Sequence, residues 1–118
     1  MEKKIVWRKN EIEPTIREGG RQSRLMIAPK NSPVQGVAMG YQIMPPGSIS
    51  TPHTHETEQE VFFVMQGHGH ARVGDQEFDI EPEMSWVACP PLEHGIWNTG
   101  DEDLIFVWCY CPPLASQK

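Results

Sequence analysis

Three residues near the middle of this chain have types and spacing suited to binding a metal ion. His53 and His55 are separated by one residue, and Glu60 follows after four more. Because successive side chains of a strand point to opposite faces, the two imidazoles should point the same way, about 6.6 Å apart along the chain. The four intervening residues leave room for a turn and the start of a returning strand. Glu60 can therefore reach the same face.

A fourth ligand has to come from a strand that folding brings near, and His94 is the only histidine later in the chain. The other two histidines, His68 and His70, flank Gly69 in an expected hairpin turn. We interpret His68 as a solvated turn residue. The direction of His70 depends on the register of the turn, which the sequence leaves open.

Three imidazoles and one carboxylate suit Fe(II), Mn(II), Ni(II) or Zn(II), and affinity alone does not choose among them. Such a set leaves one or two coordination positions open, as a catalytic metal requires. A divalent ion with one carboxylate keeps a charge of about +1 and can stabilise one bound oxyanion. The site is then compatible with a dioxygenase, with a Lewis-acid isomerase, lyase or decarboxylase, or with a non-enzymatic small-molecule-binding or sensor protein with a structural metal.

Few cations are expected near this site. After Lys30, only Arg72 and Lys118 are basic. Arg24, on an early strand, is a further candidate for a cation at the site. Sites for phosphorylated sugars or dicarboxylates commonly include an arginine or lysine clamp. We therefore expect a small, weakly charged organic substrate.

Candidate proton-transfer residues are Glu56, Tyr41 and Tyr110, because a glutamate or tyrosine beside the ligands can exchange protons with a substrate. Which face of the sheet each one occupies depends on the register. Solvated rim carboxylates are the simpler interpretation for Glu56 and its neighbour Glu58.

Short strands separated by turns should position these residues. Eleven prolines and ten glycines favour short strands over long helices. The apolar run from Val61 to Met65 lacks a polar face, so we expect that strand to be covered on both sides. The pattern predicts an all-β sandwich or barrel. Its expected strands lie at 23–28, 36–44, 61–66, 70–73, 77–80, 85–88, 95–98 and 104–110.

Charge is unevenly distributed along the 118 residues, whose net charge is −6. Eight of the ten lysines and arginines lie within residues 1–30, which we expect to form an arm that can lie across the acidic body. An acidic body disfavours nucleic acid and membrane partners. Three cysteines and the lack of an apolar leader in the sequence predict reduced thiols and a cytoplasmic location.

The segment from Gly47 to Gly67 resembles the first motif of the cupin superfamily, G-(x)5-H-x-H-(x)3-4-E-(x)6-G. Every fixed position is met, by Gly47, His53, His55, Glu60 and Gly67.

The second cupin motif, G-(x)5-P-x-G-(x)2-H-(x)3-N, is only half present. Its end is kept as His94 and Asn98, but Glu83, Cys89 and Pro91 stand where the motif has Gly, Pro and Gly. The loop at that end of the barrel should therefore differ from the family pattern.

The resemblance spans about residues 36–111 and implies a single antiparallel β-barrel of the double-stranded β-helix or jelly-roll type. We expect residues 31–118 to form this barrel, and residues 1–30, which lie outside the resemblance, to form the arm and first strand. The resemblance further implies one Mn, Fe, Ni, Co or Zn ion per chain on His53, His55, Glu60 and His94, a mostly structural role for Asn98, and a homodimer.

Overall fold

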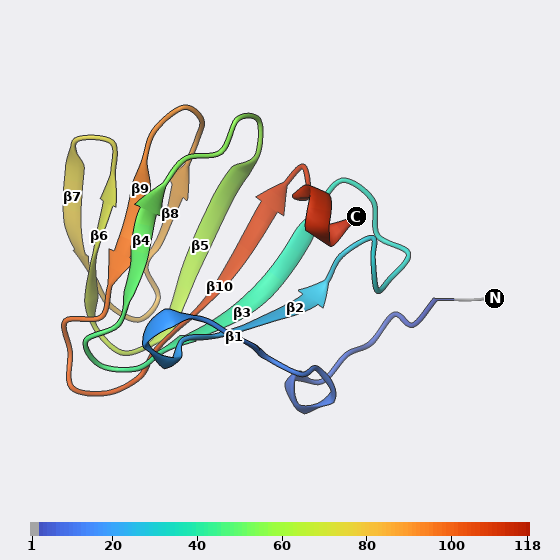
Figure 1. Cartoon of the computed structure of the whole chain (residues 1–118), viewed down its shortest axis with the longest axis horizontal. Coiled ribbons are helices and arrows are strands. Elements are labelled where there is room, and N and C mark those ends of the chain that lie inside the picture. The colour runs from blue at the N-terminus through green and yellow to red at the C-terminus, as the bar shows by residue number, and fades with distance from the viewer. Residues whose placement is uncertain (1–2) are drawn as a thin grey trace.

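Two antiparallel sheets form the fold in the computed structural model, which describes residues 3–118 (Figure 1). The larger sheet has the order β1-β2-β3-β10-β5-β8 and the smaller one β4-β9-β6-β7. This is the all-β jelly roll that the sequence predicts. The strands of the larger sheet are β1 (Thr15–Ile16), β2 (Gln22–Ile27), β3 (Ala38–Met44), β10 (Leu104–Cys111), β5 (Gln59–Gln66) and β8 (Ser85–Ala88). The strands of the smaller sheet are β4 (Ile49–His53), β9 (His94–Trp97), β6 (Gly69–Val73) and β7 (Gln76–Ile80).

Three short 3-10 turns, η1 (Lys9–Glu11), η2 (Glu18–Gly20) and η3 (Ala115–Gln117), complete the described elements. No helix in residues 3–118 has both the length and the apolar character needed to cross a membrane.

Strand β1, of only two residues, is not among the strands expected from the sequence. Neither is strand β4, although the spacing of His53 and His55 is interpreted as lying on a strand. The burial of β4 alternates weakly between exposed and half-buried residues, and it includes Pro52, so it lacks the apolar run of an ordinary strand. Proline is tolerated because β4 is an edge strand of the smaller sheet. Gly95 on the neighbouring β9 makes room for it, since a Cβ on Gly95 would lie 2.9 Å from the Pro52 ring.

The core lies between the two sheets and takes apolar side chains from both. Met44, Val64 and Leu104 of the larger sheet are fully buried, as is Ala71 of the smaller one. Gly40 of β3 is needed for this packing because a Cβ there would lie 1.9 Å from the Trp108 ring. The indole of Trp108 therefore rests directly on the backbone of β3.

The expectation that the strand around residue 63 is covered on both sides is wrong for the single chain. Strand β5 alternates strictly, with Phe62 and Val64 buried and Val61, Phe63 and Met65 on the outer face. These three outer side chains are 45–51% exposed.

Candidate metal centre

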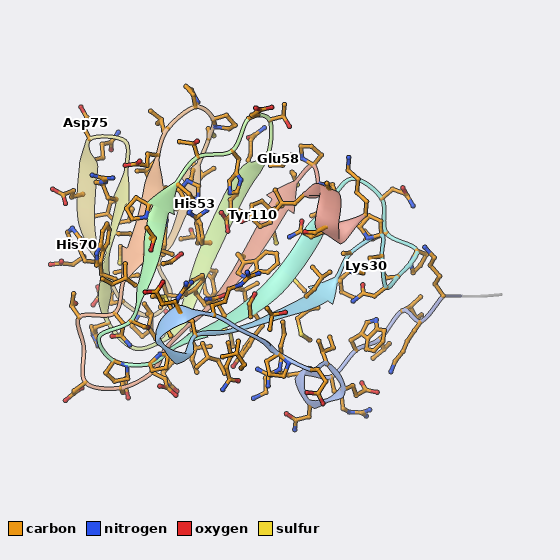
Figure 2. The ribbon with its side chains drawn as sticks, viewed as in Figure 1. Lys30, His53, Glu58, His70, Asp75 and Tyr110 are labelled. Atoms are coloured by element: carbon orange, nitrogen blue, oxygen red, sulfur yellow. The ribbon has the colours of Figure 1, made fainter. Side chains whose placement is uncertain are left out.

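The four predicted ligands come together at one end of the space between the sheets. His53 ends β4 and His94 begins β9, and the two residues are direct partners in the ladder between these strands. Figure 2 shows His53 beside β4, facing toward Tyr110. His55 lies in the loop after β4 and not on the strand itself, so alternation along a strand is not what brings the two imidazoles together.

Glu60 approaches from the opposite sheet. The returning strand β5 belongs to the larger sheet, whereas β4 belongs to the smaller one. The loop after His53 therefore crosses from one sheet to the other, and Glu60 faces the histidines across the interior. The sequence predicts Glu60 on a strand that returns on the same face as the histidines. In the structure that strand belongs to the opposite sheet, although the Glu60 side chain does reach the site.

One potential ligand atom from each of the four side chains lies within 4.8 Å of the other three. The Glu60 Oε1 atom is 3.1 Å from His94 Nε2 and 3.8 Å from His55 Nε2. The rings of His53 and His94 have centroids 4.5 Å apart. This is a donor set that can converge on a single ion.

The environments of His53 and His55 suit metal binding through Nε2. His53 Nδ1 lies 2.8 Å from the Thr51 carbonyl oxygen, and a carbonyl can only accept, so Nδ1 carries the proton and Nε2 keeps its lone pair. Burial, followed by the neighbouring His53, lowers the pKa of His55 below its ordinary value. A neutral imidazole is the form that binds a metal.

Glu60 supplies a buried negative charge. Its residue is 5% exposed, and so is that of His94. A buried carboxylate requires a compensating charge or several hydrogen bonds. The side chains around Glu60 are histidines and Tyr110, none of which is a permanent cation. A divalent cation among these four side chains satisfies that requirement, so the residues present fit a metal ion.

Tyr110 of β10 adds a hydroxyl beside the cluster. Its oxygen lies 3.4 Å from His55 Nε2, and the two rings meet edge to face. Burial, and then the charge of Glu60, raise the pKa of Tyr110 far above its ordinary value. The phenol therefore stays protonated at neutral pH and can donate a hydrogen bond or a proton.

Three of the four candidate ligands, His53, Glu60 and His94, border a cavity of about 550 Å³. Apolar side chains form part of its wall, including Phe62, Phe106 and Trp108, and hydroxyl and amide groups such as those of Ser50 and Gln42 form another part. A cavity of this size holds a small organic molecule.

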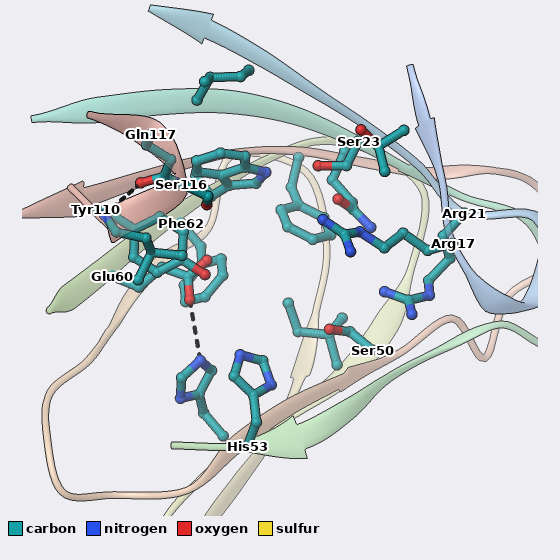
Figure 3. A pocket seen from close by; sticks show the side chains of 18 of the residues that line it. Arg17, Arg21, Ser23, Ser50, His53, Glu60, Phe62, Tyr110, Ser116 and Gln117 are labelled. Atoms are coloured by element: carbon teal, nitrogen blue, oxygen red, sulfur yellow. Dashed lines mark hydrogen bonds and ion pairs between the residues drawn. The ribbon is translucent and has the colours of Figure 1, made fainter. Parts of the chain in front are cut away.

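Two arginines that the sequence reasoning missed also line this cavity. Arg17 and Arg21 of the N-terminal arm both border it (Figure 3). The expected clamp residues are elsewhere, because Arg72 pairs with Glu93 and Arg24 donates to the Ile12 carbonyl. The expectation of few cations near the site is therefore wrong. The uneven charge of the first thirty residues was the available signal, but sequence alone does not show where the arm lies.

Of the three proposed proton-transfer residues, Tyr110 lines the cavity, whereas Glu56 and Tyr41 are not among the lining residues. Tyr41 faces the other side of β3, where Lys9 lies over its ring. His70 is on the outer side of the smaller sheet, bonded to Asp79 and Glu77. Those two carboxylates raise its pKa.

Asn98 has the structural position that the resemblance implies. Its amide donates to the carbonyl oxygens of Met44 at 2.8 Å and Glu102 at 2.9 Å, and its side-chain oxygen accepts from Gly100. The departure from the second motif is equally visible, because Glu83 adopts φ 73° where the motif has glycine.

Comparison with known proteins agrees with this architecture. A family model described as Cupin domain matches residues 40–110. The uncharacterized protein MJ1618 of Methanocaldococcus jannaschii is 24% identical over 108 residues, which cover 92% of this chain and 86% of that protein.

Solved structures match over nearly the whole chain. The structure of KdgF from Halomonas sp. has a TM-score of 0.84 at 18% identity, covering 97% of this chain and all of that one. A predicted oxalate decarboxylase from Thermotoga maritima has a TM-score of 0.82 at 23% identity, covering 92% of this chain and all of that one. At these identities the likeness concerns the fold.

Proposed function

Because this chain belongs to the cupin domain family, we propose that it is a metal-dependent enzyme acting on a small organic molecule. The observation that carries the proposal is the convergence of His53, His55, Glu60 and His94 within 4.8 Å of one another at the edge of a 550 Å³ cavity. A structural ion needs no such cavity, whereas a catalytic one needs open positions that a substrate can reach.

The donor set fits Fe(II), Mn(II), Co(II), Ni(II) or Zn(II). When bound, such an ion would supply Lewis-acid stabilisation of negative charge on a substrate oxygen. The protein orients the His53 imidazole through its hydrogen bond to the Thr51 carbonyl, and burial lowers the pKa of His55. Phe62, Phe106 and Trp108 exclude water from part of the cavity wall.

The position of Tyr110 supports a Lewis-acid reaction, such as that of an isomerase, a lyase or a decarboxylase. The Tyr110 hydroxyl lies beside the ligand His55, and burial and the Glu60 charge raise its pKa, so the phenol keeps its proton at neutral and at moderately alkaline pH. A neutral phenol at this place can give a proton to a carbanion or an enolate formed next to the ligands. A predicted oxalate decarboxylase among the similar structures is compatible with this reaction class.

Metal content is the direct test. Elemental analysis of purified protein should find about one divalent metal ion per chain. His94→Ala should lose most of that metal, because it removes a buried ligand. His68→Ala is the matched control, since His68 is exposed and outside the cluster, and it should keep the metal. Wild-type protein that stays free of metal after supplementation with each of the five ions would refute the proposal.

Turnover then separates the reaction classes. We expect wild-type protein to convert members of a panel of hydroxy acids, keto acids and sugar derivatives without consuming oxygen, and His94→Ala to be inactive at an unchanged melting temperature measured in chelator. Oxygen consumption during turnover would assign a dioxygenase instead. Saturable ligand binding without conversion would assign a non-enzymatic binding protein.

A further inference from the structure

The turn after β1 holds two arginine side chains on the same side of the arm. Strands β1 and β2 pair through Thr15 with Ser23 and Ile16 with Gln22. The backbone N–H of Arg17 donates to the carbonyl of Arg21 at 2.8 Å, and the turn between them contains Gly19 and Gly20, both with positive φ. Glycines permit this tight reversal. Arg17 and Arg21 therefore lie directly across from one another.

The same turn lies close to the loop that leads into the smaller sheet. A Cβ on Gly19 would lie 3.3 Å from the Cβ of Ser48, the residue just before β4. The arm thus starts on the larger sheet through the pairing of β1 with β2, and through Gly19 it lies close to Ser48, in the loop that leads into β4 of the smaller sheet. This contact places the turn across one side of the cavity that both sheets enclose.

The guanidinium groups are free to bind a ligand. Within residues 3–118, neither arginine forms a salt bridge, and Arg17 has no side-chain hydrogen bond. Arg21 uses only its Nε, which donates to the carbonyl of Glu18 at 3.1 Å. Figure 3 shows both side chains reaching into the cavity from the side opposite Glu60 and His53.

Two positive groups on one wall of a partly enclosed cavity repel one another. Burial, followed by the charge of Arg17, lowers the pKa of Arg21, which reflects that cost. An anion bound between them relieves the repulsion, and the planar guanidinium matches the two oxygens of a carboxylate or phosphate.

We propose that Arg17 and Arg21 bind a carboxylate or phosphate group at one end of the substrate, while the other end lies at the cluster of His53, His55, Glu60 and His94. The substrate class is then a small acid with an oxygen function at the metal end. The placement of that second end rests on the proposed function, whereas the anion site depends only on the two arginines.

Matched pairs of ligands test the anion site. Malate, 2-hydroxyglutarate and 2-hydroxyadipate share an α-hydroxy acid end, and each is compared with the monoamide of its distal carboxyl group. The pair of 3-phosphoglycerate and glycerate tests phosphate in the same way. Calorimetric titration of metal-loaded protein should show, for at least one pair, binding at least tenfold tighter for the ligand with the distal anion. The pair that shows it identifies the anion as carboxylate or phosphate.

Variants assign the effect to the arm. Arg17→Gln and Arg21→Gln should each reduce the preference for the distal anion to less than threefold, and Arg24→Gln, which alters an arginine outside the cavity lining, should leave it unchanged. Arg17→Lys and Arg21→Lys keep the positive charge but lose the planar guanidinium with its paired N–H donors. They should therefore keep part of the preference for the distal anion. Circular dichroism melting of each variant verifies that the fold is intact.

The inference is overturned if no pair shows a tenfold preference in wild-type protein, or if Arg24→Gln reduces the preference as much as the two cavity variants do. Repeating the titration on metal-free His94→Ala separates this inference from the proposed function. An anion preference that persists there and disappears in Arg17→Gln supports the anion site even if elemental analysis has refuted the metal.

Discussion

At the scale of single residues, the site combines groups whose protonation is fixed by their neighbours. Tyr110 shows this most clearly. The residue is 9% exposed, its hydroxyl lies 3.4 Å from His55 Nε2, and the buried Glu60 carboxylate next to it disfavours a second negative charge. These surroundings raise the pKa of the phenol, and that shift has a consequence for stability.

Tyr110→Phe should change how stability depends on alkaline pH. A tyrosine in the unfolded chain loses its proton near pH 10, whereas folded Tyr110 keeps it, so wild-type stability falls above that pH by up to about 1.4 kcal/mol per pH unit. The contribution of protonated Tyr110 to the free energy of unfolding is fully present below pH 10 and is lost as pH rises further. Tyr110→Phe removes this dependence on pH. Urea unfolding in chelating buffer at pH 8, 10 and 11 should show the stability of wild type falling relative to that of the variant as pH rises.

Tyr41→Phe is the control for that experiment, because it removes a tyrosine hydroxyl that lies outside the cavity. If the difference between wild type and Tyr110→Phe stays constant from pH 8 to 11, the hydroxyl of Tyr110 is not shielded as the structure indicates.

At the scale of elements, the turn between β7 and β8 explains how the chain tolerates its departure from the second motif. The N–H of Met84 donates to the Glu81 carbonyl at 3.3 Å, and Pro82 occupies the second position of this turn. Glu83, the third residue, has φ 73°. That position is one at which glycine is favoured, because a side chain is strained in the left-handed region.

Glu83→Gly should therefore stabilise the protein by about 0.5–1 kcal/mol. The substitution relieves backbone strain, and the greater entropy of glycine in the unfolded chain offsets part of that gain. Thermal or urea unfolding measures the change. Glu81→Gly, at a position of the same turn without positive φ, should lower stability. Equal effects of the two substitutions would contradict the strain argument.

The sequence predicted most of the fold and the gathering of the four candidate ligands in one cluster for a definite physical reason. Eight strands carry strong apolar or alternating patterns, and the ligand spacing around His53 and Glu60 is local. Strand β4 lacks such a pattern because its residues are mostly polar and include Pro52, and β1, with two residues, is too short to show one. Arg17 and Arg21 were missed because their place at the cavity depends on the pairing of β1 with β2 and on the contact of Gly19 with Ser48, which no local pattern encodes.

At the scale of the whole molecule, one outer face of the larger sheet is apolar and uncovered. Val61, Phe63 and Met65 of β5 and Val87 of β8 are 45–51% exposed there. Strands β5 and β8 are direct neighbours, with Val61 opposite Val87, so these side chains form one continuous patch. Contiguous apolar surface on a chain of net charge −6 is typical of an interface.

We propose that a second copy of this chain covers the patch, which would give the strand around Phe63 the two-sided cover that its sequence predicts. Light scattering of purified protein should then report a dimer. Phe63→Glu places a charge in the centre of the patch and should shift the protein to monomer, because a buried unpaired charge is costly. Metal content should be retained, since Phe63 points away from the cavity, on the face opposite Phe62.

The control is Ile49→Glu, at an equally exposed side chain of the smaller sheet, which should stay dimeric. A wild-type monomer at micromolar concentration, or a monomer produced equally by Ile49→Glu, would exclude this face as the site of self-association.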